Sequence, residues 1–144
     1  LADDFLTDYE PGVTVDLVQA FASRGKSQLS VMEVDGPDIT KYGVIVPHDS
    51  GTGIAGLVEK PDASDASSNL ASIGRYVRTP DIFDTLRGLS MGSGGEIQFA
   101  DAINIHAQQG SVETVSLNGR RFDCGSMDGY MQASHHEYQK RLLA

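Results

Sequence analysis

The chain has 144 residues, a length typical of one domain with a buried core. Its composition, 40% hydrophobic and 22% charged, is that of a globular protein, and no apolar run is long enough to cross a bilayer. A formal net charge of −9 argues against a protein that binds the nucleic-acid backbone through a basic face. Acidity of this kind still allows a nucleotide or sugar phosphate held by a few local cations or by a metal. We therefore expect no nucleic-acid partner and no membrane segment.

The beginning of the chain has the pattern of a strand end followed by a helix. Residues 1–3 resemble the end of a strand. Apolar residues at three- and four-residue spacing predict a helix over 14–24, begun by a Thr14 cap and closed by Gly25. The expected buried stripe of this helix consists of Val15, Leu17, Val18, Phe21 and Ala22.

The middle of the chain is rich in strand patterns. We predict strands over the ranges 27–34, 42–46, 54–58, 70–77 and 112–117. A loop rich in Gly, Ser and Asp separates the second strand from the third, which favours a hairpin between them. Asn118-Gly119 signals another hairpin before an extended segment at 121–122.

Helix signals recur in the second half. Thr79 and Pro80 predict the start of a helix that ends near Arg87, and a second helix is expected over 96–109. The last helix is expected from Ser126, with an apolar stripe of Met127, Met131, Ser134, Tyr138 and Leu142. Helices that alternate with strands and hairpins predict an α/β fold with a mixed sheet flanked by helices.

One strand ends in two opposite charges. An apolar run reaches Val58 and is followed by Glu59, Lys60 and Pro61. Proline cannot continue a ladder and biases the residue before it toward extended geometry, so this arrangement can aim both charges into a cleft. The alternative is a solvated strand end without a ligand.

Two isolated carboxylates are candidate metal ligands. Asp3 is expected where a strand ends, a position at which α/β sheets bind ligands, and a carboxylate there suits Mg²⁺. Asp123 precedes a glycine turn and a helix, so it is either a second ligand or a helix cap, a role that Ser126 can also take. Cys124 beside it is interpreted as a structural thiol, because no histidine partner is evident in the sequence. This single cysteine also excludes an internal disulfide and favours a reducing, cytoplasmic location.

Gly43 opens the strand over 42–46. A glycine at this position permits a ligand to approach the backbone closely, although glycine also marks β-bulges. The glycine-rich stretch 92–95 precedes a predicted helix but lacks the Lys-Ser/Thr pair of a P-loop, so it is interpreted as a connector.

Taken in order, short motifs across the chain resemble one family. They are Leu1-Ala2-Asp3-Asp4, Tyr42-Gly43-Val44, Val58-Glu59-Lys60-Pro61, Ser68-Asn69-Leu70-Ala71 with Gly74-Arg75-Tyr76, Gly95-Glu96-Ile97-Gln98 with Asp101-Ala102, and Phe122-Asp123-Cys124-Gly125 with Gly129-Tyr130. The chain is similar to the bacterial UTP–glucose-1-phosphate uridylyltransferases (UDP-glucose pyrophosphorylases), which are sugar-phosphate nucleotidyltransferases. The resemblance covers nearly the whole chain.

The resemblance implies a reaction and a set of roles. Glucose 1-phosphate attacks the α-phosphorus of UTP and gives UDP-glucose and pyrophosphate, a reaction promoted by positioning and charge neutralisation. Asp3 and Asp123 are implied to hold Mg²⁺, and Lys60 to neutralise the sugar phosphate. Glu59 is implied to accept hydrogen bonds from glucose hydroxyls, and the Gly43 backbone to lie against the sugar.

The chain also departs from the family pattern. Residues 1–144 are expected to form the sugar-binding and C-terminal part of a Rossmann-like nucleotidyltransferase fold, because the family's glycine-rich triphosphate loop is absent from them. UTP is expected to bind through that other part, and the chain alone is expected to be inactive. Two alternatives remain: a non-catalytic sugar-phosphate-binding or subunit-association module of the same fold, and a thymidylyl- or guanylyltransferase relative. The full-length protein is expected to be a homo-oligomer.

Overall fold

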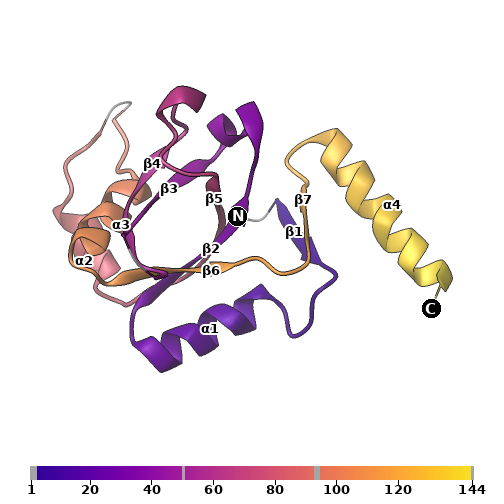
Figure 1. The fold of residues 1–144 in the computed structure, drawn as a ribbon, viewed down its shortest axis with the longest axis horizontal. Helices are drawn as coiled ribbons and strands as arrows, with labels where there is room; N and C mark the ends of the chain where they lie inside the picture. The colour runs from indigo at the N-terminus through magenta and orange to yellow at the C-terminus, as the bar shows by residue number, and fades with distance from the viewer. Residues whose placement is uncertain (1–2, 50, 93–94, 144) are drawn as a thin grey trace.

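The computed structural model describes residues 3–49, 51–92 and 95–143 (Figure 1). In these residues a five-stranded sheet is flanked by helices, and a separate two-stranded sheet lies beside it. The elements are β1 (Asp4–Thr7), α1 (Val13–Arg24), β2 (Ser27–Glu33), β3 (Gly43–Pro47), β4 (Ile54–Glu59), β5 (Leu70–Val77), α2 (Ile82–Gly88), α3 (Phe99–Gln108), β6 (Val112–Ser116), β7 (Arg120–Asp123) and α4 (Met127–Leu143), with short 3-10 helices at Gly36–Lys41 and Ala63–Asp65.

The larger sheet has the strand order β4-β3-β5-β2-β6. Strand β2 runs parallel to β6 and antiparallel to β5, so the predicted mixed α/β sheet is confirmed. Strands β3 and β4 form the predicted antiparallel hairpin, in which Gly43 lies opposite Glu59. The predicted strand over 70–77 is β5.

The main core lies between this sheet and α3. Leu29 and Val31 of β2 pack in one cluster with Leu57 of β4 and Ile103 of α3. Helix α3 is also fastened to β4 by hydrogen bonds. The side-chain oxygen of Asn104 accepts from the Leu57 N–H at 2.7 Å, and its Nδ2 donates to the Leu57 carbonyl at 3.0 Å.

Helix α1 lies where it was predicted, but Leu17 is the only member of its expected stripe that is fully buried. Val13 and Leu17 are buried, whereas Val15 and Val18 are exposed. Residues four apart share a face of a helix, so Val13 and Leu17 lie together on the buried face. Val15 and Val18 lie off this face and are exposed to solvent. The N-cap is Gly12 and not Thr14, while Gly25 closes the helix in the left-handed conformation as predicted.

The predicted hairpin at Asn118-Gly119 is wrong. Strand β6 pairs with β2, and β7 instead pairs with β1, with Asp4 opposite Asp123. Gly119 has φ 98°, and a β-carbon on it would lie only 2.5 Å from the Thr7 carbonyl oxygen. The glycine therefore allows the chain to pass close to the backbone at the end of β1. Strand β1 itself was not predicted. Asp3 lies in a turn directly before it, and residues 1–2 of the expected strand end lie outside the described residues.

Two helices begin later than predicted. Helix α2 begins at Ile82 and α3 at Phe99, so Glu96 lies before α3. The Gly92 N–H donates to the Glu96 carbonyl at 2.9 Å, so the Glu96 carbonyl bonds to a residue outside the helix.

Helix α4 lies at the edge of the molecule, against the two-stranded sheet (Figure 1). Ser126 Oγ accepts a hydrogen bond from the Gly129 N–H at 3.1 Å, so Ser126 is the cap of this helix. Ala133 is buried, but the apolar members of the expected stripe are exposed: Met127, Met131, Tyr138 and Leu142. Within the described ranges, neither α4 nor any other helix has the length and apolarity to cross a membrane.

Candidate functional site

A cleft of about 450 Å³ opens where the β3–β4 hairpin, the start of α3 and the two-stranded sheet meet. Its lining includes all five residues singled out from the sequence: Asp3, Gly43, Glu59, Lys60 and Asp123. These residues come from the two ends of the chain and from its middle. Folding therefore brings them to one cavity, although Asp3, Gly43, the Glu59–Lys60 pair and Asp123 are far apart in the sequence.

The charged pair lies at the end of β4. This strand ends at Glu59. The extended geometry expected for Lys60 before Pro61 is wrong, because Lys60 adopts a left-handed backbone with φ 47°, which is uncommon for a residue with a side chain. The Lys60 N–H donates to the Tyr42 carbonyl at 3.0 Å, and Pro61 is buried behind it. The buried proline and this hydrogen bond hold the turn, while both charged side chains remain exposed at the cleft.

Gly43 makes room for the Glu59 carboxylate. A β-carbon on Gly43 would lie 3.0 Å from Glu59 Oε2 and 3.1 Å from Leu57 Cδ2. The register irregularity of β3 lies between Val46 and Pro47, away from Gly43. A need for space beside Glu59, and not a bulge, therefore explains the glycine.

Asp3 and Asp123 flank the same point at the opposite side of the cleft. A β-carbon on Gly125 would lie 2.8 Å from Asp3 Oδ2 and 3.1 Å from Asp123 Oδ1. The Cys124 N–H donates to the Asp3 carbonyl at 2.8 Å, and the Gly125 N–H donates to Asp123 Oδ1 at 3.1 Å. Two neighbouring carboxylates are a donor set that suits Mg²⁺, which takes oxygen ligands and shares its shell with phosphates.

Tyr42 and Arg121 are among the residues lining the cleft that sequence reasoning did not assign to the site. Arg121 Nη1 donates to the Tyr42 hydroxyl at 3.0 Å, and Nε forms an ion pair with Asp4 Oδ1. Arg121 is only 11% exposed. Its position depends on the pairing of β7 with β1, which the local pattern around Asn118-Gly119 did not indicate.

Comparison with known proteins identifies the family. A family model described as nucleotidyl transferase matches residues 1–140. The chain belongs to the nucleotidyl transferase family. It is 42% identical over 143 residues to a UTP–glucose-1-phosphate uridylyltransferase of Pseudomonas aeruginosa, a match that covers 96% of this chain and 51% of that protein.

Solved structures agree with this assignment. An apo UDP-glucose pyrophosphorylase superposes with a TM-score of 0.90 at 39% identity and covers 98% of this chain and 53% of its own. A UDP-glucose pyrophosphorylase complexed with UDP-glucose gives 0.88 at 38% identity and covers 97% and 55%. The resemblance and the fold class predicted from the sequence are thus confirmed. The chain spans about half the length of these relatives.

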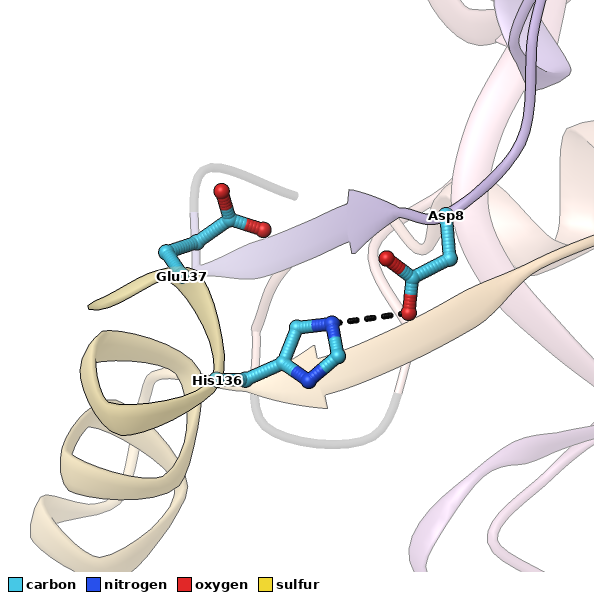
Figure 2. A group of neighbouring side chains, drawn as sticks. All are labelled: Asp8, His136 and Glu137. Atoms are coloured by element: carbon cyan, nitrogen blue, oxygen red, sulfur yellow. Dashed lines mark ion pairs between the residues drawn. The ribbon is translucent and has the colours of Figure 1, made fainter. Parts of the chain in front are cut away.

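A second cluster of side chains lies outside the cleft, between the end of β1 and α4 (Figure 2). Asp8, His136 and Glu137 approach one another, with their potential ligand atoms within 4.8 Å. His136 Nε2 lies 2.8 Å from Asp8 Oδ2. The ammonium of Lys140 lies 2.9 Å from Asp8 Oδ1 and 3.4 Å from Glu137 Oε1. Because a cation already neutralises both carboxylates, we interpret the cluster as an ion-paired clasp that holds α4 and not as a metal site.

The clasp shifts the titration of its carboxylates. Hydrogen bonds from His136 and Lys140 lower the pKa of Asp8 from 3.8 to about 2. A hydrogen bond from the Thr7 hydroxyl, at 2.8 Å, lowers the pKa of Glu137. A carboxyl group whose pKa is lowered by folding stabilises the folded state above its unfolded pKa, and this contribution is lost as the pH falls through the folded pKa.

We therefore expect Asp8→Asn to loosen α4 in a pH-dependent way. Amide hydrogen exchange in α4 should be faster than in the unmodified chain near neutral pH, and the difference should shrink between pH 4 and about pH 2 as Asp8 becomes protonated. Asparagine tolerates the left-handed backbone of Asp8, φ 64°, so the substitution mainly removes charge.

The matched control is Asp84→Asn, which removes an exposed carboxylate paired with Arg87 on α2. This control should leave exchange in α4 unchanged. An Asp8→Asn effect of the same size at pH 7 and at pH 2 would show that the carboxylate charge does not hold the helix.

Proposed function

We propose that this chain is the sugar-phosphate-binding and C-terminal part of a UTP–glucose-1-phosphate uridylyltransferase. The observation that carries the proposal is the gathering of Asp3, Gly43, Glu59, Lys60 and Asp123 around one cleft. It is supported by relatives of that name and by the fold shared with a structure complexed with UDP-glucose. In the proposed reaction, a phosphate oxygen of glucose 1-phosphate bonds to the α-phosphorus of UTP. The bond to the β-phosphate oxygen breaks, and pyrophosphate leaves with its electron pair.

The β4 end is proposed to bind the sugar phosphate. Lys60 supplies a point positive charge for the phosphate, and the Glu59 carboxylate accepts hydrogen bonds from sugar hydroxyls. Gly43 has no side chain between its backbone and the Glu59 carboxylate, so a sugar ring held by Glu59 can also lie against that backbone. No nucleophilic side chain is needed in this scheme, which agrees with Cys124 contributing its backbone N–H to the fold.

Asp3 and Asp123 are proposed to hold Mg²⁺. Their oxygens flank one point beside Gly125, and an ion there would supply neutralisation of phosphate charge. The role of the chain is to fix both carboxylates before the ion binds. It does so through the Cys124 and Gly125 N–H groups, which bond to the Asp3 carbonyl and to the Asp123 carboxylate.

We expect Lys60→Ala to weaken the binding of glucose 1-phosphate by about 10- to 100-fold, the usual cost of losing one charge-assisted contact. Isothermal titration of the chain with glucose 1-phosphate measures this. The fold should be retained because the Lys60 side chain is exposed. Lys26→Ala is the control, since Lys26 pairs with Glu113 and does not line the cleft. Unchanged affinity in Lys60→Ala would remove Lys60 from the binding site.

We expect Asp3→Asn and Asp123→Asn each to weaken divalent-cation binding by about 10-fold or more, because an amide oxygen carries no net charge for the ion. Mn²⁺ titration followed by electron paramagnetic resonance measures the affinity directly. Asp84→Asn, which removes a carboxylate that does not line the cleft, serves again as the control. Affinity equal to that of the unmodified chain in both cleft variants would argue for a different metal site.

The isolated chain is proposed to be inactive. UTP is proposed to bind through the family's glycine-rich loop, which these 144 residues do not contain. We expect no pyrophosphate release from UTP and glucose 1-phosphate with Mg²⁺, measured by a coupled phosphate assay. Measurable release would contradict this expectation. A second experiment adds the half of the protein that carries the glycine-rich loop. If the sugar phosphate then binds but no turnover occurs, the result would favour a non-catalytic module. Turnover with another nucleoside triphosphate would favour a thymidylyl or guanylyl relative.

The full-length protein is proposed to be a cytoplasmic homo-oligomer. The single cysteine suits a reducing compartment. Helix α4 supports association with a second copy, because several large apolar side chains on it are exposed, among them Met127, Met131, Tyr138, Leu142 and Leu143.

A further inference from the structure

Arg121 lies where the two sheets meet at the cleft. It belongs to β7, opposite Leu6 of β1, and its side chain is only 11% exposed. Neither the motifs of the sequence nor the proposed roles of the cleft residues account for an arginine buried at this point. Its contacts reach both sides of the cleft.

One contact fixes the beginning of β1. Arg121 Nε lies 2.5 Å from Asp4 Oδ1, and the Asp4 side chain is 1% exposed. A buried ion pair of this kind strongly resists separation, because removal of either partner leaves an uncompensated charge. Asp4 directly follows Asp3, so the pair also fixes the backbone that carries the Asp3 carboxylate.

A second contact reaches the five-stranded sheet. Arg121 Nη1 donates to the Tyr42 hydroxyl at 3.0 Å, and the guanidinium carbon lies 5.1 Å from the centre of the Tyr42 ring. Tyr42 precedes Gly43, and its carbonyl accepts the Lys60 N–H. Tyr42 therefore connects Arg121 with the turn that carries Lys60.

A third contact reaches the Asp123 carboxylate. Arg121 Nη2 lies 3.9 Å from Asp123 Oδ2, while Oδ1 accepts the Gly125 N–H. One oxygen of Asp123 is therefore hydrogen-bonded and the other lies near a positive charge, which favours this orientation of the carboxylate.

We propose that Arg121 is a positioning residue that fixes the Asp3–Asp123 pair relative to the Glu59–Lys60 turn. The proposal rests on the proposed function, because it assigns a ligand to each side of the cleft. A guanidinium suits this task since it presents donors in several fixed directions. A lysine at this position retains the charge but cannot satisfy Asp4, Tyr42 and Asp123 together.

The test compares Arg121→Lys and Arg121→Met with the unmodified chain by amide hydrogen exchange. The Lys60 and Cys124 amides, which bond to the carbonyls of Tyr42 and Asp3, should each lose protection by about 10-fold in both variants. The Leu57 amide, which bonds to Asn104, should keep its protection. Equal loss at Leu57 would indicate general destabilisation and would overturn the positioning role, as would unchanged protection at Lys60 and Cys124.

Binding gives an independent readout. Titration with glucose 1-phosphate and with Mn²⁺ should show both affinities reduced about 10-fold in Arg121→Lys, although the charge is kept. Arg120→Lys, at the more exposed neighbouring position, is the control and should leave both affinities unchanged. Full affinity in Arg121→Lys would show that charge alone suffices and would overturn the proposal.

If the unmodified chain binds neither probe, the proposed function fails, while the exchange data still decide whether Arg121 fixes the two sides of the cleft. Arg121→Lys keeps the test open if Arg121→Met does not fold.

Discussion

The antiparallel pairing of β1 with β7 is the constraint on which the cleft depends. It places Asp4 opposite Asp123, although these residues are near opposite ends of the chain. The pairing puts the two candidate metal-binding carboxylates beside one glycine and provides the surface on which α4 lies. Because contacts between distant residues cost chain entropy before they return stability, such a pairing needs strong local reinforcement.

Ionic contacts supply that reinforcement on both sides of the small sheet. On the cleft side, the buried Asp4–Arg121 pair ties β1 to β7. On the helix side, Asp8 is shared by His136 and Lys140 of α4. A two-stranded sheet has little apolar surface of its own and is marginal in isolation. Charge pairing and the packing of Phe5 against Phe122 compensate for that deficiency.

The sequence predicted the local features well and the distant ones poorly. Strand β5, the β3–β4 hairpin and the end of β4 at Glu59 follow from alternation and proline chemistry within a few residues. The five cleft residues could be singled out as candidates from their types and local settings, each with a non-functional alternative. Their meeting in one cavity was expected only through the family resemblance, since no local pattern encodes it.

The errors have a common physical cause. Asn118-Gly119 carries a strong hairpin signal, but the chain uses its glycine to cross β1, a partner far away in the sequence. The apolar stripe of α4 gave no sign of how the helix docks, which is through Ala133 and the charged clasp. In both cases a tertiary contact between the two ends of the chain decided the outcome, and so Arg121 went unnoticed.

The attachment of Asn104 to Leu57 has a consequence for solubility. Strand β4 is at the edge of its sheet, and an open edge can recruit a strand from another molecule. The Asn104 amide occupies the outward N–H and carbonyl of Leu57, at the middle of that edge. A side chain on α3 thus occupies hydrogen-bonding groups that a strand of another molecule would need, near the strand end that is proposed to bind the sugar phosphate.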